Sequence, residues 1–359
     1  MLGFWDLDLG ISGALVSPTD SKASAPAGLV DLAAARVGGK ALLANDEFFA
    51  EKENLLKPGR GVFIADKYTD RGKWMDGWET RRRRTPGHDW CVVQLGLRGI
   101  IKQVDIDTNH FLGNHPPFAS LDASCLTTGF PSDASGVESL PWTSILEKSP
   151  LNPGSQNLFA ITSDQTWTHA RLNIFPDGGV ARLRLYGIVV PDWSKLKPGE
   201  LVDLAAVENG GVPLACSDMF FSSMNNLIMP GRSENMGDGW ETKRRRGPGY
   251  DWIIVKLGRP GTIQKIEVDT NHFKGNYPDM CSIEGCIAPG ASIDELTSSG
   301  ARWSEILPKT KLQPHTRHFF EKELASIEEC THIRLNIYPD GGVSRLRVWG
   351  KAGGMTKHE

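Results

Sequence analysis

The run Asp107-Thr-Asn109-His110 combines side chains that can orient a polar substrate and move protons near neutral pH. Asp107 and Asn109 fall on one face of a strand in which apolar and charged residues alternate, and His110 ends that strand. A second copy contains Asp269, Asn271 and His272. We treat the Asp and His residues as candidate catalytic groups and the Asn residues as candidate substrate contacts. A structural alternative stays open, in which an Asp–His or an Asn–backbone network only pins the following loop.

A second duplicated pattern joins an aromatic residue, an acid and a run of arginines. Trp78 and Glu79 precede Arg81–Arg84 and a Pro-Gly pair. The planar guanidinium of Arg pairs with both oxygens of a small carboxylate. Four adjacent cations cannot all point into one site, so most of them are expected to be solvated or paired with acids. The candidate substrate contacts of this pattern are Trp78, Arg83, Trp240 and Arg245.

A third pattern is Arg-Leu-Asn followed by Ile, an aromatic residue and Pro-Asp-Gly-Gly. The Pro-Asp-Gly-Gly run is ordinary hairpin chemistry, in which Gly supplies positive φ. Arg and Asn alternate with apolar residues, so they lie away from the core, either on the surface or on the floor of a pocket. The candidate substrate contacts are Arg171, Asn173, Arg334 and Asn336.

These patterns occur twice in the same order, at a shift of 162 or 163 positions, which indicates a duplicated domain. We expect a loose arm at 1–27, repeat 1 at 28–189, a Pro-containing linker at 190–200, repeat 2 at 201–351 and a tail at 352–359. The copies differ chiefly at Gly61–Met75, where repeat 1 is ten residues longer. This segment is where the two halves could differ in function.

Short β-branched runs bounded by Gly and Pro predict an all-β fold. Separate strands are expected at Trp90–Leu95 and Gln103–Thr108, with their counterparts in the second copy. Helical periodicity appears only near Leu29–Arg36 and Trp142–Glu147 and at the equivalent positions. The expected architecture is two tandem, duplicated, jelly-roll-like β-sandwich domains with short helices.

Composition narrows the function classes. The net charge is −3, and the arginine runs are flanked by acids, so nucleic acid is not an expected partner. The sequence has neither a signal-peptide pattern nor an apolar run of about 20 residues, so no membrane span is expected. None of the six cysteines is shared by both copies, which favours reduced thiols in a cytoplasmic protein. His315 and His318 have metal-like spacing, but a loop is the favoured interpretation.

The chain resembles the allantoicase family in long, ordered segments. These segments are EFFAEKENLLKPGR (47–60), KYTDRGKWMDGWETRRRRTPGHDW (67–90), MGDGWETKRRRGPGYDW (236–252), both DTNHF-x-GN runs and both RLNI-x-PDGGV runs. The resemblance covers residues 28–351 and implies two related jelly-roll domains. Tyr250 departs from the pattern, because the matching position in repeat 1 is His88.

The resemblance implies a hydrolase of linear amidine-type C–N bonds, which converts allantoate to ureidoglycolate and urea in purine degradation. It also implies a small-molecule partner, allantoate, and a homo-oligomer. A divalent metal accompanies some members, so the cofactor is left open and no metal ligand is assigned. Within this chemistry, Glu284, which replaces Asp122 in the second copy, is a further candidate acid. The alternatives are a non-catalytic jelly-roll module that binds sugar-like ligands and an enzyme that acts mainly on ureidoglycolate.

Overall fold

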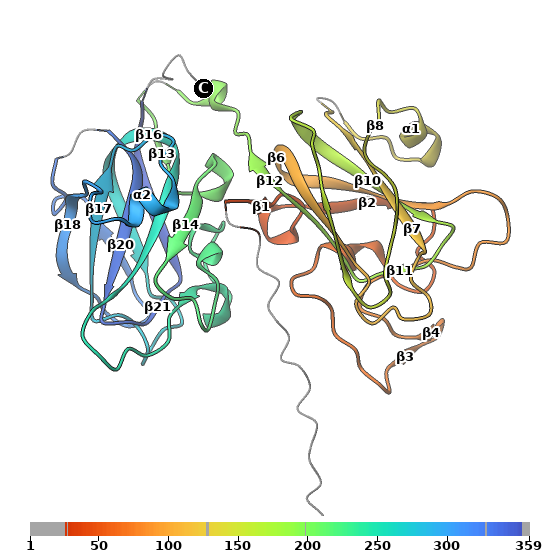
Figure 1. The fold of residues 1–359 in the computed structure, drawn as a ribbon, viewed down its shortest axis with the longest axis horizontal. Helices are drawn as coiled ribbons and strands as arrows, with labels where there is room; N and C mark the ends of the chain where they lie inside the picture. Colours follow the sequence, from red (N-terminus) through yellow and green to blue (C-terminus); the bar gives the residue numbers. More distant parts are fainter. Residues whose placement is uncertain (1–25, 27, 127–128, 198, 327–328, 354–359) are drawn as a thin grey trace, which may run out of the picture.

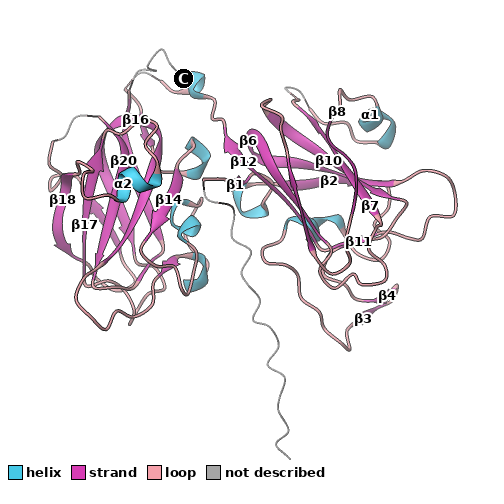
Figure 2. Ribbon diagram, in the orientation of Figure 1, coloured by secondary structure: helices cyan, strands magenta, loops and turns pink. Residues whose placement is uncertain are grey.

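Two β-sandwich units follow one another along the chain and are joined by a short connection (Figure 1). The computed structural model describes residues 26, 28–126, 129–197, 199–326 and 329–353. Most of the predicted arm, except residue 26, and the end of the tail from 354 lie outside the described residues. Strands form nearly all the regular structure, with only short helices beside them (Figure 2). The prediction of an all-β fold with two tandem β-sandwich domains is confirmed.

The elements of the two repeats correspond in order. Repeat 1 contains β1 (Val30–Asp31), β2 (Lys40–Ala44), β3 (Tyr68–Thr69), β4 (Gly72–Lys73), β5 (Trp78–Glu79), β6 (Asp89–Asp107), β7 (Phe118–Ser124), β8 (Thr143–Pro150), β9 (Gln156–Ala160), β10 (Trp167–Phe175), β11 (Gly179–Val180) and β12 (Arg182–Val189). Repeat 2 contains β13 (Leu201–Asp203), β14 (Val212–Cys216), β15 (Trp240–Glu241), β16 (Asp251–Asp269), β17 (Met280–Cys286), β18 (Ser304–Lys311), β19 (Arg317–Phe320), β20 (Cys330–Tyr338), β21 (Gly342–Val343) and β22 (Arg345–Ala352). The helices are α1 (Ala134–Glu138), α2 (Ile293–Thr297) and the 3-10 turns η1 (Ala35–Val37), η2 (Lys52–Leu56), η3 (Trp193–Lys195), η4 (Val207–Asn209), η5 (Met224–Ile228) and η6 (Met236–Asp238).

One long strand takes part in both layers of each sandwich. The first half of β6 pairs with β2 and β10, and its second half pairs with β12 and β9. The chain passes from one half to the other near Gly96, where a Cβ atom would lie 2.4 Å from the Val37 carbonyl oxygen, so only Gly fits. The prediction of two separate strands here is wrong, because residues 89–107 form one continuous strand.

Alternation along the strands builds the core. Val104 and Ile106 on β6 and Leu183 and Leu185 on β12 are fully buried and belong to the same apolar cluster. Burying each of these side chains contributes about 1.5–3 kcal/mol. The polar residues that alternate with them point to the opposite face of the sheet. Asp107, the last residue of β6, is one of these polar residues. The core therefore fixes where the candidate site residues emerge.

The predicted helical periodicity at Trp142–Glu147 is wrong. This segment enters β8, and the helix of the region is α1, which begins after Asp133. The Asp133 side chain accepts a hydrogen bond from the Gly136 N–H and caps that helix. Thr143–Pro150 instead completes the sheet beside β7, and tertiary pairing overrides the local pattern.

A polar contact joins the two repeats. The Arg36 guanidinium donates to Asn226 Oδ1 at 2.8 Å and pairs with Asp238 at 3.1 Å. Asp238 also pairs with the buried Arg345 of its own repeat. Repeat 2 has Glu208 at the position that matches Arg36, so this link has no symmetric copy.

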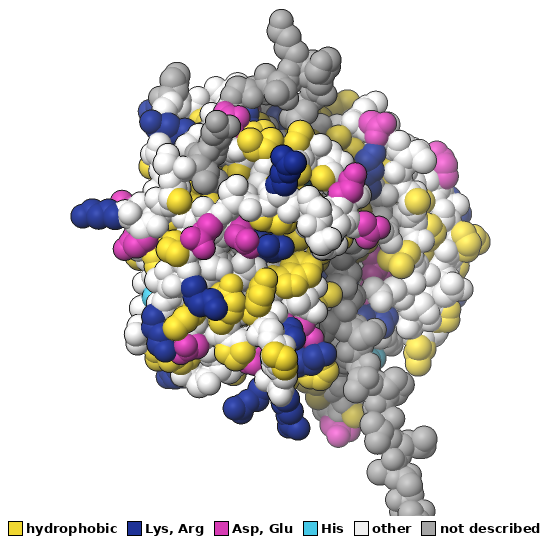
Figure 3. Space-filling model, turned by 60° about the vertical axis from the view of Figure 1, so that its left-hand side comes forward, with side chains coloured by type: hydrophobic (Ala, Val, Ile, Leu, Met, Phe, Trp, Pro, Cys, Tyr) yellow, Lys and Arg dark blue, Asp and Glu magenta, His cyan; other side chains and the backbone are white. Residues whose placement is uncertain are grey.

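Charged side chains of both signs are interspersed over the face of the molecule that Figure 3 presents. Among the described residues, no helix has the length and apolar content needed to cross a membrane. All six cysteines are free thiols. Burial raises the pKa of the Cys216 and Cys286 thiols to about 11, so these groups are poor nucleophiles.

The buried ion pair between Asp76 and Arg182 should stabilise repeat 1. Asp76 Oδ2 accepts from Arg182 Nη2 at 2.8 Å, and Arg182 is 2% exposed. We expect Asp76→Asn to lower the free energy of unfolding by roughly 3–5 kcal/mol, because it leaves a buried cation without its partner. Urea unfolding measures the change. Asp164→Asn is the control, since Asp164 pairs with Lys102 at the surface; equal losses in the two variants would contradict this expectation.

Candidate active site

The three duplicated patterns meet at one end of each sandwich. β5 pairs with β11, so Glu79 lies opposite Gly179. The Gly179 N–H donates to the Asn114 carbonyl oxygen at 2.8 Å, and the Gly178 N–H donates to Thr80 Oγ1 at 3.1 Å. Repeat 2 has the same contacts through Glu241, Thr242, Asn276, Gly341 and Gly342. Segments distant in sequence therefore form one polar rim in each repeat.

In repeat 1 this rim borders a cavity of about 380 Å³. That volume suits a small organic ligand. The polar side chains at the cavity are Lys73, Glu79, His110 and Asn114, and the apolar ones are Phe49, Met75 and Leu112. Among the predicted catalytic residues, His110 lies here. The sequence predictions do not include Glu79 or Asn114. Both residues occur in both copies of their patterns, and this duplication is the sequence signal that could have identified them.

Glu79 is the acid of this cavity. Its Oε1 accepts a hydrogen bond from Asn114 Nδ2 at 2.7 Å, and the side chain is half-buried. Burial raises the pKa of Glu79, and the bond from Asn114 opposes that rise only in part. A carboxyl group with a raised pKa retains its proton closer to neutral pH and can deliver it to a leaving group.

His110 has an unusual backbone conformation beside this acid. Its φ is 69°, in the left-handed region that residues other than Gly seldom adopt. The exposed ring lies 5.6 Å from the Phe63 ring, centroid to centroid. His272 has the same backbone, with φ of 70°. Because both copies keep this conformation, it belongs to the loop framework that the two repeats share, and in repeat 1 it places the imidazole beside the cavity.

Asp107 and Asn109 hold the loop that carries His110. Asp107 is buried and accepts two hydrogen bonds from Arg60, at 2.8 and 3.0 Å, and a third from the Asn109 N–H at 2.9 Å. Asn109 Nδ2 donates to the Arg60 carbonyl oxygen at 3.1 Å. In repeat 2, the corresponding residues are Asp269, Asn271, Arg232 and Ser233. This geometry matches the Asn–backbone form of the loop-pinning alternative, while the carboxylate of Asp107 pairs with Arg60 and not with His110.

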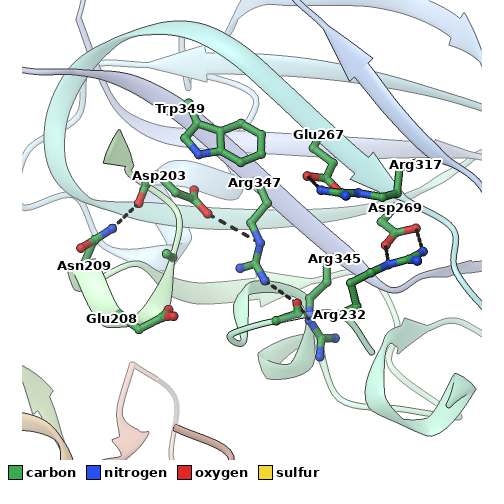
Figure 4. Close-up of a pocket in the computed structure, with 12 residues that line it drawn as sticks. Asp203, Glu208, Asn209, Arg232, Glu267, Asp269, Arg317, Arg345, Arg347 and Trp349 are labelled. Carbon is green, nitrogen blue, oxygen red and sulfur yellow. Dashed lines mark hydrogen bonds and ion pairs between the residues drawn. The ribbon is translucent and has the colours of Figure 1, made fainter. Parts of the chain in front are cut away.

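Asp269 also borders a cavity of about 390 Å³ in repeat 2 (Figure 4). Its four arginines already have partners: Arg232 pairs with Asp269, Arg317 with Glu267, Arg345 with Asp238 and Arg347 with Asp203. Burial raises the pKa of Asp203 to about 6. The cations of this cavity serve the framework, and neither predicted His lines it.

Other predicted residues form a separate cluster on the outer face of each sheet. Arg171 donates to Asp122 Oδ2 at 2.7 and 3.0 Å, and Asn173 Nδ2 donates to the same oxygen at 2.9 Å. The guanidinium lies 4.8 Å from the centroid of the Trp142 ring. His88 lies beside this group, and its burial lowers the pKa of the imidazole. Repeat 2 has Arg334, Asn336, Glu284 and Trp303 in the same arrangement.

The arginines selected as carboxylate clamps are engaged by acids. Arg83 Nη1 donates to Asp89 Oδ1 at 2.7 Å, and its backbone N–H donates to Asp177 at 2.8 Å. Arg245 pairs with Asp251 in the same way. Trp78 and Trp240 are fully buried, and their indole N–H groups donate to backbone carbonyl oxygens at 2.8 Å. These tryptophans belong to the core and lie out of reach of a substrate.

The described side chains do not form a site that fits a divalent metal. Over the described ranges, no three His, Cys, Asp or Glu side chains are grouped so as to hold an ion. His318 illustrates the reason, because its Nδ1 lies 3.0 Å from the Val268 carbonyl oxygen and its Nε2 accepts from the Gln313 N–H at 2.8 Å. Asn157 makes the equivalent bonds in repeat 1. We assign no step to a metal.

Asp107 should act by positioning the loop. We expect Asp107→Asn to weaken its contact with Arg60 and to lower the free energy of unfolding by about 1–3 kcal/mol. Since Asp107 does not border the cavity of repeat 1, the shape of the pH–rate profile of the enzyme should not change. Urea unfolding and steady-state kinetics across pH check both expectations. Loss of one limb of the profile would instead give Asp107 a direct role in proton transfer.

Comparison with known proteins identifies the family. The family model for the allantoicase repeat matches residues 30–190 and 202–353. A probable allantoicase from Pseudomonas aeruginosa (strain UCBPP-PA14) is 51% identical over 89% of this chain and 95% of its own length. Probable allantoicase 1 from Burkholderia mallei is 51% identical over 89% of this chain and 94% of its own length. The crystal structure of allantoicase from Saccharomyces cerevisiae has a TM-score of 0.76 and 39% identity, covering 90% of this chain and 93% of that one. The chain therefore belongs to the allantoicase family.

Proposed function

We propose that this chain hydrolyses allantoate to ureidoglycolate and urea. The observation that carries the proposal is family membership, which extends over both repeats and almost the whole length of the relatives named allantoicase. The cavity of repeat 1 supports the assignment, since it gathers an acid, an imidazole, an amide and an ammonium group. A sugar-binding module or an enzyme specific for ureidoglycolate is not favoured.

The chemistry of allantoate sets the requirements of the site. Its central carbon carries a carboxylate and two ureido groups. Cleavage of one C–N bond becomes easier when the departing nitrogen receives a proton and the remaining ureido nitrogen donates its lone pair to form an N-acyliminium ion. Water then adds to the central carbon and loses a proton. The site must therefore supply an acid, a base, amide contacts and a cation.

We assign these roles to the groups at the cavity. Protonated Glu79 donates its proton to the departing urea nitrogen, and His110 accepts a proton from the water that adds. Asn114 holds Glu79 through one N–H and has its second N–H for a ureido oxygen. Transfer of the proton from His110 back to Glu79, through solvent, completes the cycle. The sum is allantoate and water giving ureidoglycolate and urea.

The remaining predicted residues receive supporting roles in this proposal. Asp107 and Asn109 orient the His110 loop, and Trp78 anchors β5, the strand that carries Glu79, in the core. Arg83 stabilises the start of β6 by its ion pair with Asp89, and Arg171 stabilises the outer face of the sheet by its ion pair with Asp122. The corresponding residues of repeat 2 are Asp269, Asn271, His272, Trp240, Arg245, Arg334, Asn336 and Glu284.

A homo-oligomer, which the family resemblance implies, and a cytoplasmic location stay part of the proposal. Exposed apolar side chains near the site support self-association, among them Phe63 at 49% and Tyr68 at 67% exposed. Native mass spectrometry of the full chain tests the assembly.

Glu79→Gln should remove the acid while keeping a hydrogen-bonding partner for Asn114. We expect kcat to fall by roughly 10²- to 10⁴-fold, the usual contribution of a general acid. Because burial raises the pKa of Glu79, the enzyme should retain its active, protonated form to a higher pH than an exposed Glu would allow. Its activity should then fall as pH rises through that pKa, and the variant should lack this limb. An unchanged profile would exclude Glu79 as the acid.

The overall reaction is tested with purified full-length chain and allantoate. We expect urea and ureidoglycolate to appear in equal amounts, each measured by its own assay. Chelator-treated enzyme is compared with and without an added divalent ion to test metal dependence. Failure to release urea in either condition would overturn the proposed function.

A further inference from the structure

The inserted segment of repeat 1 forms one wall of the cavity. Residues 61–75 include the hairpin of β3 and β4, which projects at the lower edge of repeat 1 in Figure 1. Met75 is buried against Phe111 and Ala181, so the end of the insertion is anchored to the sandwich. The neighbouring Asp76 is fixed by Arg182. This anchoring holds Lys73, at the end of β4, beside the cavity.

Lys73 presents a positive charge that no carboxylate neutralises among the described residues. Its ammonium group donates to the Ala65 carbonyl oxygen and lies 5.0 Å from the Phe63 ring centroid and 4.7 Å from that of Tyr68. These neutral partners position an ammonium group without cancelling its charge. Arg83 and Arg171, in contrast, already pair with Asp89 and Asp122. Lys73 is the cation of the cavity that remains available to an anionic ligand.

Repeat 2 has no counterpart of this wall. Five residues, 233–237, replace the fifteen residues 61–75, and η6 occupies the place of the hairpin. Lys274 stands at the position of Leu112, but its side chain is exposed. The second rim therefore keeps the acid and the amide of the first, at Glu241 and Asn276, and has a differently placed cation.

The imidazole of repeat 2 is also held differently. His272 Nε2 lies 2.9 Å from the Ser233 carbonyl oxygen, and the backbone N–H of His272 donates to His315 Nδ1 at 2.8 Å. His315, with φ of 50°, stands where repeat 1 has Gly154, with φ of 60°. A Cβ at Gly154 would lie 2.7 Å from Leu112 Cδ2, so the small residue makes room for Leu112 beside the cavity. The exposed imidazole of His110 makes no such bond to a carbonyl group within the described part of the chain.

We infer that Lys73 binds the carboxylate of the substrate and that hydrolysis takes place at the rim of repeat 1. This inference rests on the proposed function, because it concerns the same site and the same class of anionic substrate. Lys73 receives the carboxylate at the insertion side of the cavity, and the departing ureido group lies towards Glu79 and His110. Repeat 2 retains the framework of the rim but lacks the wall that carries the anchoring charge.

The test is Lys73→Met in the full chain. Loss of one charged hydrogen bond to the carboxylate should raise the KM for allantoate roughly 10- to 100-fold. Lys73→Arg should recover most of the affinity, because it keeps the charge. Lys67→Met is the matched control from the same insertion, since Lys67 lies over the Trp74 ring and does not line the cavity. Its KM should stay within about twofold of the original value.

Two further variants compare the repeats. Lys274→Met should change the KM less than threefold, and Glu241→Gln should reduce kcat much less than Glu79→Gln. A large effect of Lys274→Met together with a small effect of Lys73→Met would overturn the inference and assign catalysis to repeat 2. Equal effects of the two Glu variants would also overturn it.

Binding separates this inference from the proposed function. Calorimetry measures the Kd for allantoate in the Glu79→Gln variant and in the same variant that also carries Lys73→Met. Neither protein turns over the substrate, so the difference in Kd gives the contribution of Lys73 to binding. A Kd unchanged by Lys73→Met, in a chain whose original form hydrolyses allantoate, contradicts the Lys73 assignment alone. An original chain that neither binds nor hydrolyses allantoate contradicts both.

Discussion

A buried network of charges at the end of β6 is the constraint on which the site depends. Asp107 binds Arg60, and Arg182, its partner on β12, binds both the side chain and the carbonyl oxygen of Asp76. Buried charges are costly unless they are paired and hydrogen-bonded, so these contacts have little freedom to change. The network fixes the loop that carries His110 and the start of the segment that carries Glu79. One set of ion pairs thus determines where the acid and the imidazole lie.

This network also explains why so many polar residues survive in both repeats. Presence in both copies does not by itself mark a residue of the site, because Asp107 and Arg182 are held in buried ion pairs with Arg60 and Asp76 that close one end of the sandwich. The residues with chemistry to offer lie at the rim of the network, where Glu79 and Asn114 meet. Framework residues and site residues occur in the same sequence patterns. They can be told apart only by their burial and by their hydrogen-bond partners in the folded structure.

Much of the fold could be predicted from the alternation of apolar and polar residues and from the turn residues. Features that depend on tertiary contacts could not be predicted in this way. The alternation around Val104 and Ile106 identified the core face, because burial acts on every second residue of a strand. The continuity of β6 was missed, because Gly96 resembles a strand boundary although it permits close packing within one strand. The engagement of Arg83 by Asp89 depends on tertiary geometry, and a run of four arginines does not indicate which of them is paired. His110 could be selected by type, whereas Lys73 could not, since the insertion has no second copy for comparison.

The two repeats therefore differ where a physical account of duplication expects them to differ. Each sandwich must retain the charges that close its own end, because breaking a buried pair destabilises the whole unit. The rim carries no such penalty, since residues there are at least partly solvated and contribute little to folding. An insertion beside one rim can add a wall and a cation, while the other rim can fix its imidazole against Ser233 and replace Gly154 with His315. The residues that the two repeats share thus mainly form the common framework. The residues in which their rims differ are the ones that bear on catalysis.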